Sequence, residues 1–276
     1  MSVTNVKVLT SVLDKSLTKD KYSDCIIIAS VNELHLRLLY FSPLENKVLG
    51  FEKIHFDSLD KLIDFLKEKE VLNFKQLKFV LTPEKFTLVP KAFFQPGDEV
   101  KYLNFNSPLT KNEKVRFETL LNDTLVNIYA IESSFIAQLD ALIKFKITSL
   151  NSALIEYAAS LNEQQVISVH LLKDKFFITI CKDKKLHFQN IFNYTTVEDF
   201  IYYLLFSLDQ LEIDNQKVCI HLSGKIDKTS IFYATLLAYV HQIKLVNELE
   251  KFSFSNVFND FPKQHIMDLL FVLKCE

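Results

Sequence analysis

The sequence predicts a two-lobed α/β fold in which each lobe holds a mixed five-stranded sheet flanked by helices. Strand-like runs and amphipathic helices alternate along its 276 residues. Each half opens with three closely spaced strands, followed by a helix and a further strand. The content of 49% hydrophobic and 24% charged residues is ordinary for a folded protein. A chain of this length can bury a large core without disulfides or metal.

The first half begins with a mixed polar stretch to about Ser23, which we expect to be peripheral. Three strands are then predicted close together, because short apolar or alternating runs are separated by turn residues. Their ranges are residues 25–30, 33–41 and 47–56. The first run is continuously apolar, which is typical of a central strand.

A helix is predicted next, at residues 59–66, where apolar residues recur at spacings of three and four. Asp57 or Ser58 can cap its first turn. Strands at 77–81 and 86–89 follow, and then a short helical segment at 91–94.

The middle of the chain is less regular. Pro96, Gly97 and Pro108 predict a loop over residues 95–114, with a short strand at 100–105. We treat residues 95–122 as an irregular insertion in the first lobe. Later elements are a strand at 124–131 and helices at 132–145 and 151–160. The lobes are therefore expected to cover residues 1–150 and 151–276.

The second half repeats the order of the first and then adds a helix and a strand. The predicted strands are 166–171, 176–181, 186–192, 217–222 and 243–246, with helices at 197–211 and 231–240. Thr195 and Glu198 have the spacing of a capping box, and Asp227 is the predicted cap of the last helix. No residue-level repeat is visible, so the duplication is inferred from element order alone.

Charge and cysteine content exclude several classes of protein. The net charge is −2, acids and bases are interspersed, and Arg37 and Arg116 are the sole arginines. This pattern is not that of a nucleic-acid-binding protein, and the excess of Lys over Arg is typical of an AT-rich genome. The four cysteines form no CxxC pair, so a zinc or redox site is not expected. The N-terminus has no secretory signal and no apolar run approaches the length of a membrane span, so we expect a cytoplasmic protein.

Several segments carry a family resemblance: FVLTP at 79–83, TLVP at 87–90, YLNFN at 102–106, VNIYA at 126–130 and VEDFIYY at 197–203. With the duplicated element order, they make the chain from about Asp24 onward resemble an uncharacterised Bacteroidota family of unknown function. That family has an actin-like ATPase fold, which is a duplicated ribonuclease H-like fold. More distantly, the chain is similar to the actin-like proteins of pilus assembly and cell division.

The resemblance implies two phosphate-binding hairpins, each with an Asp at the end of its first strand and a Gly in its turn. The matching positions are Ala29 and Val31 in the first half and His170 and Leu172 in the second. A metal-bound water needs the carboxylate, and a phosphate needs the close backbone approach that Gly allows. We therefore expect no catalytic residue, no bound metal and no cofactor. Asp174, the nearest acid, is expected to be a solvated turn residue.

The resemblance also places a vestigial adenosine site at Ser223, Gly224 and Lys225, between a strand and a helix. Actin-like proteins carry a Gly pair there, and this chain keeps one Gly. A tight turn is the competing interpretation of that glycine. The segment is not a P-loop, because the upstream Gly and the Ser or Thr after the Lys are missing.

Aromatic residues cluster near the start of the helix at 197–211. Tyr202 and Tyr203 lie on it, with Phe192 and Tyr194 shortly before. Such rings can stack on RNA bases, but we expect core packing, since the chain holds 25 Phe and 10 Tyr. The acids Glu198 and Asp199 are expected to stabilise the helix dipole rather than to form a catalytic pair.

Three functional hypotheses remain open. The first is a non-catalytic actin-like scaffold or adaptor whose protein partner binds between the lobes or at residues 95–122. The second is a nucleotide-binding sensor, or an ATPase or kinase-like enzyme of the actin superfamily. The third, suggested by the family resemblance, is an accessory factor in rRNA processing.

Overall fold

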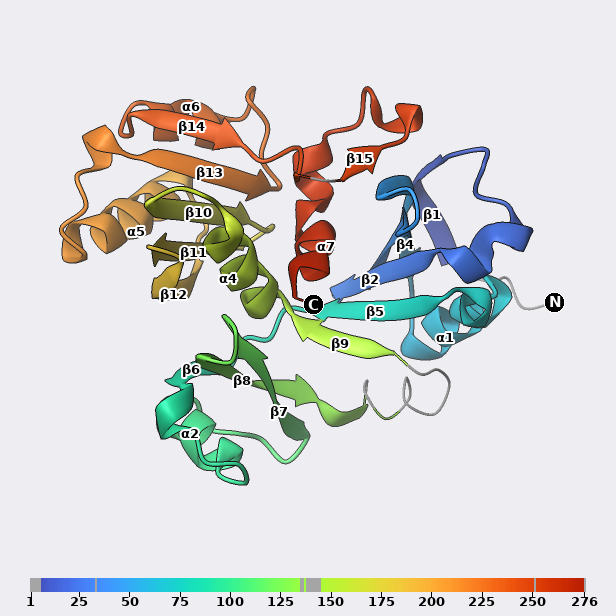
Figure 1. Ribbon diagram of the computed structural model, residues 1–276, viewed down its shortest axis with the longest axis horizontal. Helices are drawn as coiled ribbons and strands as arrows, with labels where there is room; N and C mark the ends of the chain where they lie inside the picture. Colours follow the sequence, from blue (N-terminus) through green and yellow to red (C-terminus); the bar gives the residue numbers. More distant parts are fainter. Residues whose placement is uncertain (1–5, 33, 135–136, 138–144, 251, 276) are drawn as a thin grey trace. The chain divides into compact units, whose positions relative to one another are not determined.

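The computed structural model describes residues 6–32, 34–134, 137, 145–250 and 252–275 (Figure 1). The chain divides into two compact units. Unit 1 comprises residues 1–152 and 250–261, and unit 2 comprises residues 153–249 and 262–276. Most of the predicted helix at 132–145 lies outside the described residues.

The large sheet of unit 1 has seven strands within the described residues, in the order β1-β4-β3-β2-β5-β9, with β15 pairing with β4. Strands β2, β3 and β4 form an antiparallel meander, and β5 and β9 add to it in parallel. The bounds are β1 Val6–Leu13, β2 Ile26–Asn32, β3 His35–Ser42, β4 Lys47–Phe56, β5 Gln76–Leu81, β9 Lys146–Ser149 and β15 Ser253–Phe254. Helix α1 (Leu59–Glu68) begins at its predicted N-cap, Ser58, whose side chain accepts from the Lys61 N–H.

Strand β1 corrects the prediction of a peripheral polar start. It pairs antiparallel with β4 along its length and forms the edge of the sheet. Most of its residues are half-buried or exposed, including Val8 and Leu13. An edge strand with little burial needs no apolar run, so its mixed sequence did not reveal it.

A second, three-stranded antiparallel sheet completes unit 1, with the order β6-β8-β7. Its strands are β6 Phe86–Pro90, β7 Glu113–Leu120 and β8 Leu125–Glu132, and helix α2 (Glu99–Asn106) contacts all three. The strand predicted at 100–105 is wrong, because these residues form α2. Leu103 buries one face of the helix against Val126 and Ile128, so tertiary packing overrides the short apolar alternation.

Unit 2 contains a five-stranded sheet with the order β12-β11-β10-β13-β14 (Figure 1). This order matches β4-β3-β2-β5-β9 of unit 1, including the antiparallel meander and the two parallel additions. The predicted duplication of element order is confirmed. The bounds are β10 Gln165–Leu171, β11 Lys175–Lys182, β12 Lys185–Asn193, β13 Cys219–Gly224 and β14 Gln242–Leu245.

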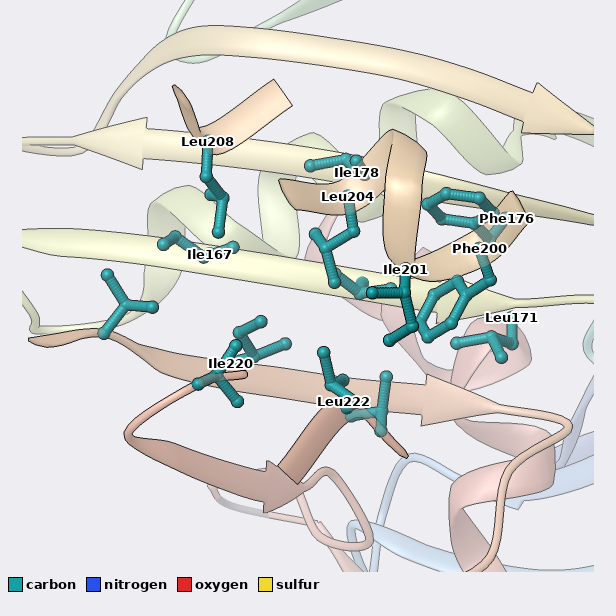
Figure 2. Close-up of a cluster of buried hydrophobic side chains, with 14 of the residues drawn as sticks. Ile167, Leu171, Phe176, Ile178, Phe200, Ile201, Leu204, Leu208, Ile220 and Leu222 are labelled. Carbon is teal, nitrogen blue, oxygen red and sulfur yellow. The ribbon is translucent and has the colours of Figure 1, made fainter. Parts of the chain in front are cut away.

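Helices α5 (Val197–Gln210) and α6 (Ile231–Leu237) cover one face of this sheet. Figure 2 shows side chains of α5, among them Phe200 and Leu204, directed at the apolar strand residues. Both predicted caps need correction. Thr196 and Asp199 form the capping box of α5, one residue later than predicted, and Ser230 rather than Asp227 caps α6.

The other face of the unit 2 sheet carries more polar side chains. Ser168, His170, His221 and Ser223 alternate with the core residues and are all buried. The C-terminal elements η6 (Lys263–Ile266) and α7 (Met267–Phe271) contact β13. Tyr157 of α4 (Leu150–Ser160) stacks on Phe271, with ring centroids 4.1 Å apart. The remaining short helical turns are η1 Lys19–Asp24, η2 Val71–Asn73, η3 Lys91–Phe93, η4 Asn215–Lys217, η5 Asn256–Phe258 and η7 Val272–Lys274.

Candidate functional site

The carboxyl ends of β10 and β13 bring together most of the residues predicted for the second half. The strands are parallel neighbours, with His170 opposite Ser223 and Leu171 opposite Gly224. Ligands of open α/β sheets bind outside the carboxyl ends of strands, so this is the edge where a site is expected. Whether the edge can receive a ligand depends on what these residues already contact.

The Ser223 hydroxyl is engaged inside the sheet. It is buried, and its Oγ lies 2.9 Å from Nδ1 of the buried His170 on the neighbouring strand. A buried hydroxyl that has a protein partner is costly to redirect, because the partner would lose its hydrogen bond. The predicted residues His170 and Ser223 therefore form one internal contact.

Gly224 is required by a close backbone approach. Its φ is +92°, and an added Cβ would lie 2.0 Å from the Leu171 carbonyl oxygen. The next residue, Lys225, donates its N–H to that oxygen at 2.8 Å. Glycine is the residue that tolerates both the left-handed conformation and such contact.

The loop after Gly224 is held by the C-terminal segment. Nε2 of Gln264 donates to the carbonyl of Ile226 at 3.1 Å and to Oδ1 of Asp227 at 2.6 Å. His265 Nε2 lies 3.2 Å from the other carboxylate oxygen of Asp227. Asp227, predicted as a helix cap, thus joins this loop to η6.

The turn between β10 and β11 is closed in a similar way. The N–H of Leu172 donates to the Lys175 carbonyl at 2.8 Å. The Tyr194 hydroxyl donates to the Leu172 carbonyl at 2.8 Å, and the Tyr194 N–H donates to the Asp174 carbonyl at 3.0 Å. Burial raises the pKa of Tyr194, so it remains a donor at neutral pH. The Asp174 residue is exposed in this turn.

These contacts do not fit a phosphate or adenosine cradle. The space beside Gly224 is filled by Leu171, and the hydroxyl of Ser223 is taken by His170. Backbone N–H groups that bind phosphate have to point at the ligand, whereas Lys225 donates its N–H to the protein. Within the part of the chain that the structure describes, no group of three or more His, Cys, Asp or Glu side chains could hold a metal ion.

The equivalent strand ends of unit 1 line a pocket of about 680 Å³. Val31 lies near the end of β2, and Leu81 ends β5. Ala29, by contrast, is fully buried within β2 and belongs to the core of the unit. The pocket is lined mainly by apolar residues: Val31, Leu34, Phe56, Leu59, Leu81, Pro83, Ala130 and Ile131. Its volume is in the range of sites that bind small molecules.

Charged groups also line this pocket. Lys85 Nζ lies 2.8 Å from Glu113 Oε2 and donates to the Pro108 carbonyl at 2.7 Å. The hydrogen bond from Lys85 lowers the pKa of Glu113, with further help from the Thr110 N–H. Glu84 and Glu132 are exposed at the pocket. The lining therefore holds three carboxylates and one ammonium group.

A separate polar network joins β7 to the start of α4 in unit 1. The Glu118 carboxylate accepts from the Tyr129 hydroxyl at 3.0 Å, from the Ser149 N–H at 3.1 Å and from the Ser152 hydroxyl. Asn127 donates to Ser152 Oγ at 2.9 Å. Burial raises the pKa of Glu118, although its hydrogen bonds and Lys146 oppose the rise. With three protein donors on its two oxygens, this carboxylate supports the fold.

A family of proteins of unknown function, DUF3822, matches residues 14–243. The chain belongs to this family. No curated protein matches it.

The structure of this DUF3822 protein is similar to that of a Bacteroides thetaiotaomicron protein with an actin-like ATPase fold and unknown function. The TM-score is 0.75 at 21% identity, over 94% of this chain and 99% of the other. It is also similar to PilM in the PilM-PilN type IV pilus biogenesis complex. The TM-score is 0.64 at 12% identity, over 91% of this chain and 98% of the other. A third similar structure is the cytoplasmic domain of EpsL, an inner membrane component of the Vibrio cholerae type II secretion system. The TM-score is 0.51 at 9% identity, over 91% of this chain and 96% of the other.

These likenesses show an actin-like ATPase fold and confirm the predicted fold class. The DUF3822 protein has no helix, among its described residues, that is long and apolar enough to cross a membrane. Sequence reasoning missed Gln264 and Glu118. Their partners lie 38 and 34 residues away for the Gln264–Ile226 and Glu118–Ser152 pairs, and no local spacing signals such contacts.

Proposed function

We propose that this DUF3822 protein is a non-catalytic, actin-like scaffold or adaptor that binds a protein partner in the cytoplasm. The proposal rests on one observation: the residues predicted to bind a nucleotide contact other residues of the protein instead. Ser223 is bonded to His170, and Gly224 packs on Leu171. A protein that needed these groups for nucleotide would leave them facing its ligand.

The pocket of unit 1 supports a protein partner. Its apolar residues can bind an apolar side chain, and its carboxylates can bind a basic one. A peptide segment can offer both kinds of side chain. Two proteins of the same fold occur in assemblies: PilM in a complex with PilN, and EpsL in a secretion system. We extend the principle of partner binding to this chain, not the identity of the partners.

A thermal shift assay tests the nucleotide part of the proposal. ATP, ADP and GTP, each with Mg²⁺, are expected to leave the melting temperature unchanged at millimolar concentration. A ligand present at 100 times its Kd would stabilise the fold by about 2.7 kcal/mol, which such an assay detects readily. A shift with any of them, together with turnover, would instead support the nucleotide sensor or enzyme.

Two matched leucine variants test the partner site. Leu34 lines the pocket and is 43% exposed, whereas Leu44 lies in the next hairpin turn, outside the pocket lining, and is 86% exposed. Leu34→Asp is expected to abolish capture of a stoichiometric partner from cell extract, and Leu44→Asp to preserve it. Equal capture by both variants would exclude the pocket. RNA binding at low salt, where non-specific affinity is strongest, would favour the rRNA-processing alternative.

A further inference from the structure

The solvent-facing side of α5 carries aromatic residues where a surface helix is normally polar. Phe200, Ile201, Leu204 and Leu208 point at the sheet (Figure 2). The exposed residues of α5 lie away from the sheet and are Glu198, Tyr202, Phe206, Asp209 and Gln210. We call Glu198, Tyr202, Phe206 and Asp209 the α5 stripe.

The two aromatic residues of the α5 stripe are well exposed. Tyr202 is 60% exposed and Phe206 is 47% exposed, and their rings stack at 5.9 Å between centroids. Tyr202 also contacts Tyr203, which stacks on Phe192 of the edge strand β12 at 5.1 Å. Isolated exposed apolar residues are common, whereas two stacked and exposed aromatic rings are of the residue types enriched at protein–protein interfaces. The predicted core packing holds for Phe192 and Tyr203, which pack against the core of unit 2, and fails for Tyr202.

The charge around these rings restricts the partner. Helix α5 contains Glu198, Asp199 and Asp209 and no Lys or Arg. Asp199 is occupied in the capping box, which leaves the carboxylates of Glu198 and Asp209 on either side of the two rings. These two carboxylates disfavour a phosphate group of RNA or of an anionic lipid next to the rings. They also disfavour the face-to-face pairing of two copies of the helix, because acid would meet acid.

We propose that the α5 stripe is a docking site for a basic amphipathic helix of a partner protein. The apolar side of that helix would cover Tyr202 and Phe206, so that it packs on α5 as one helix packs on another. Its Lys or Arg side chains would pair with Glu198 and Asp209 and lie over the ring faces. The α5 stripe belongs to unit 2, so this inference does not depend on the pocket of unit 1.

Fluorescence anisotropy with a defined probe tests the proposal on the full chain. The probe is a labelled amphipathic peptide of Leu and Lys, about 18 residues long so that it can form a helix. A peptide of Leu and Glu with the same pattern is its control. We expect the Lys peptide to bind in a salt-dependent manner and the Glu peptide not to bind.

Variants then locate the binding. The double variant Tyr202→Ser and Phe206→Ser is expected to weaken Lys-peptide binding by at least about tenfold, the effect of removing a central anchor. Phe105→Ser is the matched control, since Phe105 is 90% exposed in unit 1. Leu34→Asp, which tests the pocket, is expected to leave peptide binding unchanged.

Glu198→Lys provides a second measurement, because this exposed position can change without loss of core packing. This variant is expected to weaken the binding of the Lys peptide and to strengthen the binding of the Glu peptide. The proposal is overturned if the Lys peptide does not bind, if the Glu peptide binds equally well, or if neither the double variant nor Glu198→Lys changes the affinity.

Discussion

The main sheets of the two units share five strands in the same order, but these strands end differently. In unit 2, the ends of β10 and β13 are joined to each other through Leu171 and Lys225 and are held by Gln264. In unit 1, the corresponding ends of β2 and β5 line an open pocket beside Val31. Shared topology therefore does not produce a shared site. The side chains and loops that follow each strand decide whether its end is closed or accessible.

Gly224→Ala is the change with the largest expected effect on the closed end. The added methyl meets the Leu171 carbonyl, and the positive φ is strained for any residue with a Cβ. We expect the free energy of unfolding to fall by about 3 kcal/mol or more, because strain and a backbone displacement add together. Urea denaturation followed by circular dichroism measures it.

Gly97 is the matched control for Gly224. Its φ is +96°, but an added Cβ meets no described atom within 4 Å. Gly97→Ala therefore isolates the conformational cost, which we expect to be about 1 kcal/mol. Equal losses for the two variants would show that the close approach to Leu171 contributes nothing.

Glu118 gives the next largest effect and belongs to unit 1. Glu118→Ala leaves the Ser149 N–H, the Tyr129 hydroxyl and the Ser152 hydroxyl without their acceptor. We expect a loss of about 2 kcal/mol in the free energy of unfolding, because buried donors are left unsatisfied. Hydrogen exchange should rise in the first turn of α4. Unchanged exchange there would show that the carboxylate does not hold this turn.

The raised pKa of Glu118 also predicts a pH dependence. Because its folded-state pKa lies above the ordinary value of 4.5, the folded state takes up this proton more readily than the unfolded state. The carboxyl group thus contributes most stability below pH 4.5 and loses that contribution as the pH rises through the folded-state pKa. Wild type should lose stability relative to Glu118→Gln over that range. A constant difference between the two proteins would contradict the assignment.

Regular packing explains why most of the fold could be predicted. The strands of unit 2 are short runs rich in apolar residues, such as residues 166–171, and the side of α5 that faces the sheet is apolar, so the local sequence of each element indicates its type. Strand β1 and helix α2 could not be predicted in this way. Strand β1 is an exposed edge strand, and α2 is stabilised by the packing of Leu103. The periodicity of apolar residues indicates which face of a single helix or strand is buried. It does not indicate which residues distant in sequence pack against that face.

The sequence could not show what the predicted site residues contact. The family resemblance pointed to Ser223 and Gly224, and the structure places them opposite His170 and Leu171 at the strand ends. The groups that they contact belong to the parallel strand β10: His170 for Ser223 and Leu171 for Gly224. Such contacts are set by tertiary structure. The presence of a glycine in the sequence therefore could not show whether it approaches a ligand or another part of the protein backbone.

The smallest expected effect compares the helix caps in equivalent positions of the two units. Thr196 of α5 and Asp199 cap each other reciprocally, with the Asp199 N–H donating to Thr196 Oγ1 at 3.1 Å. Ser58 of α1 accepts a single, longer hydrogen bond of 3.4 Å from the Lys61 N–H. Thr196→Ala is therefore expected to cost about 1 kcal/mol and Ser58→Ala about 0.5 kcal/mol. Paired denaturation curves measure both, and a larger loss for Ser58→Ala would show that cap geometry does not rank the stability of these two helices.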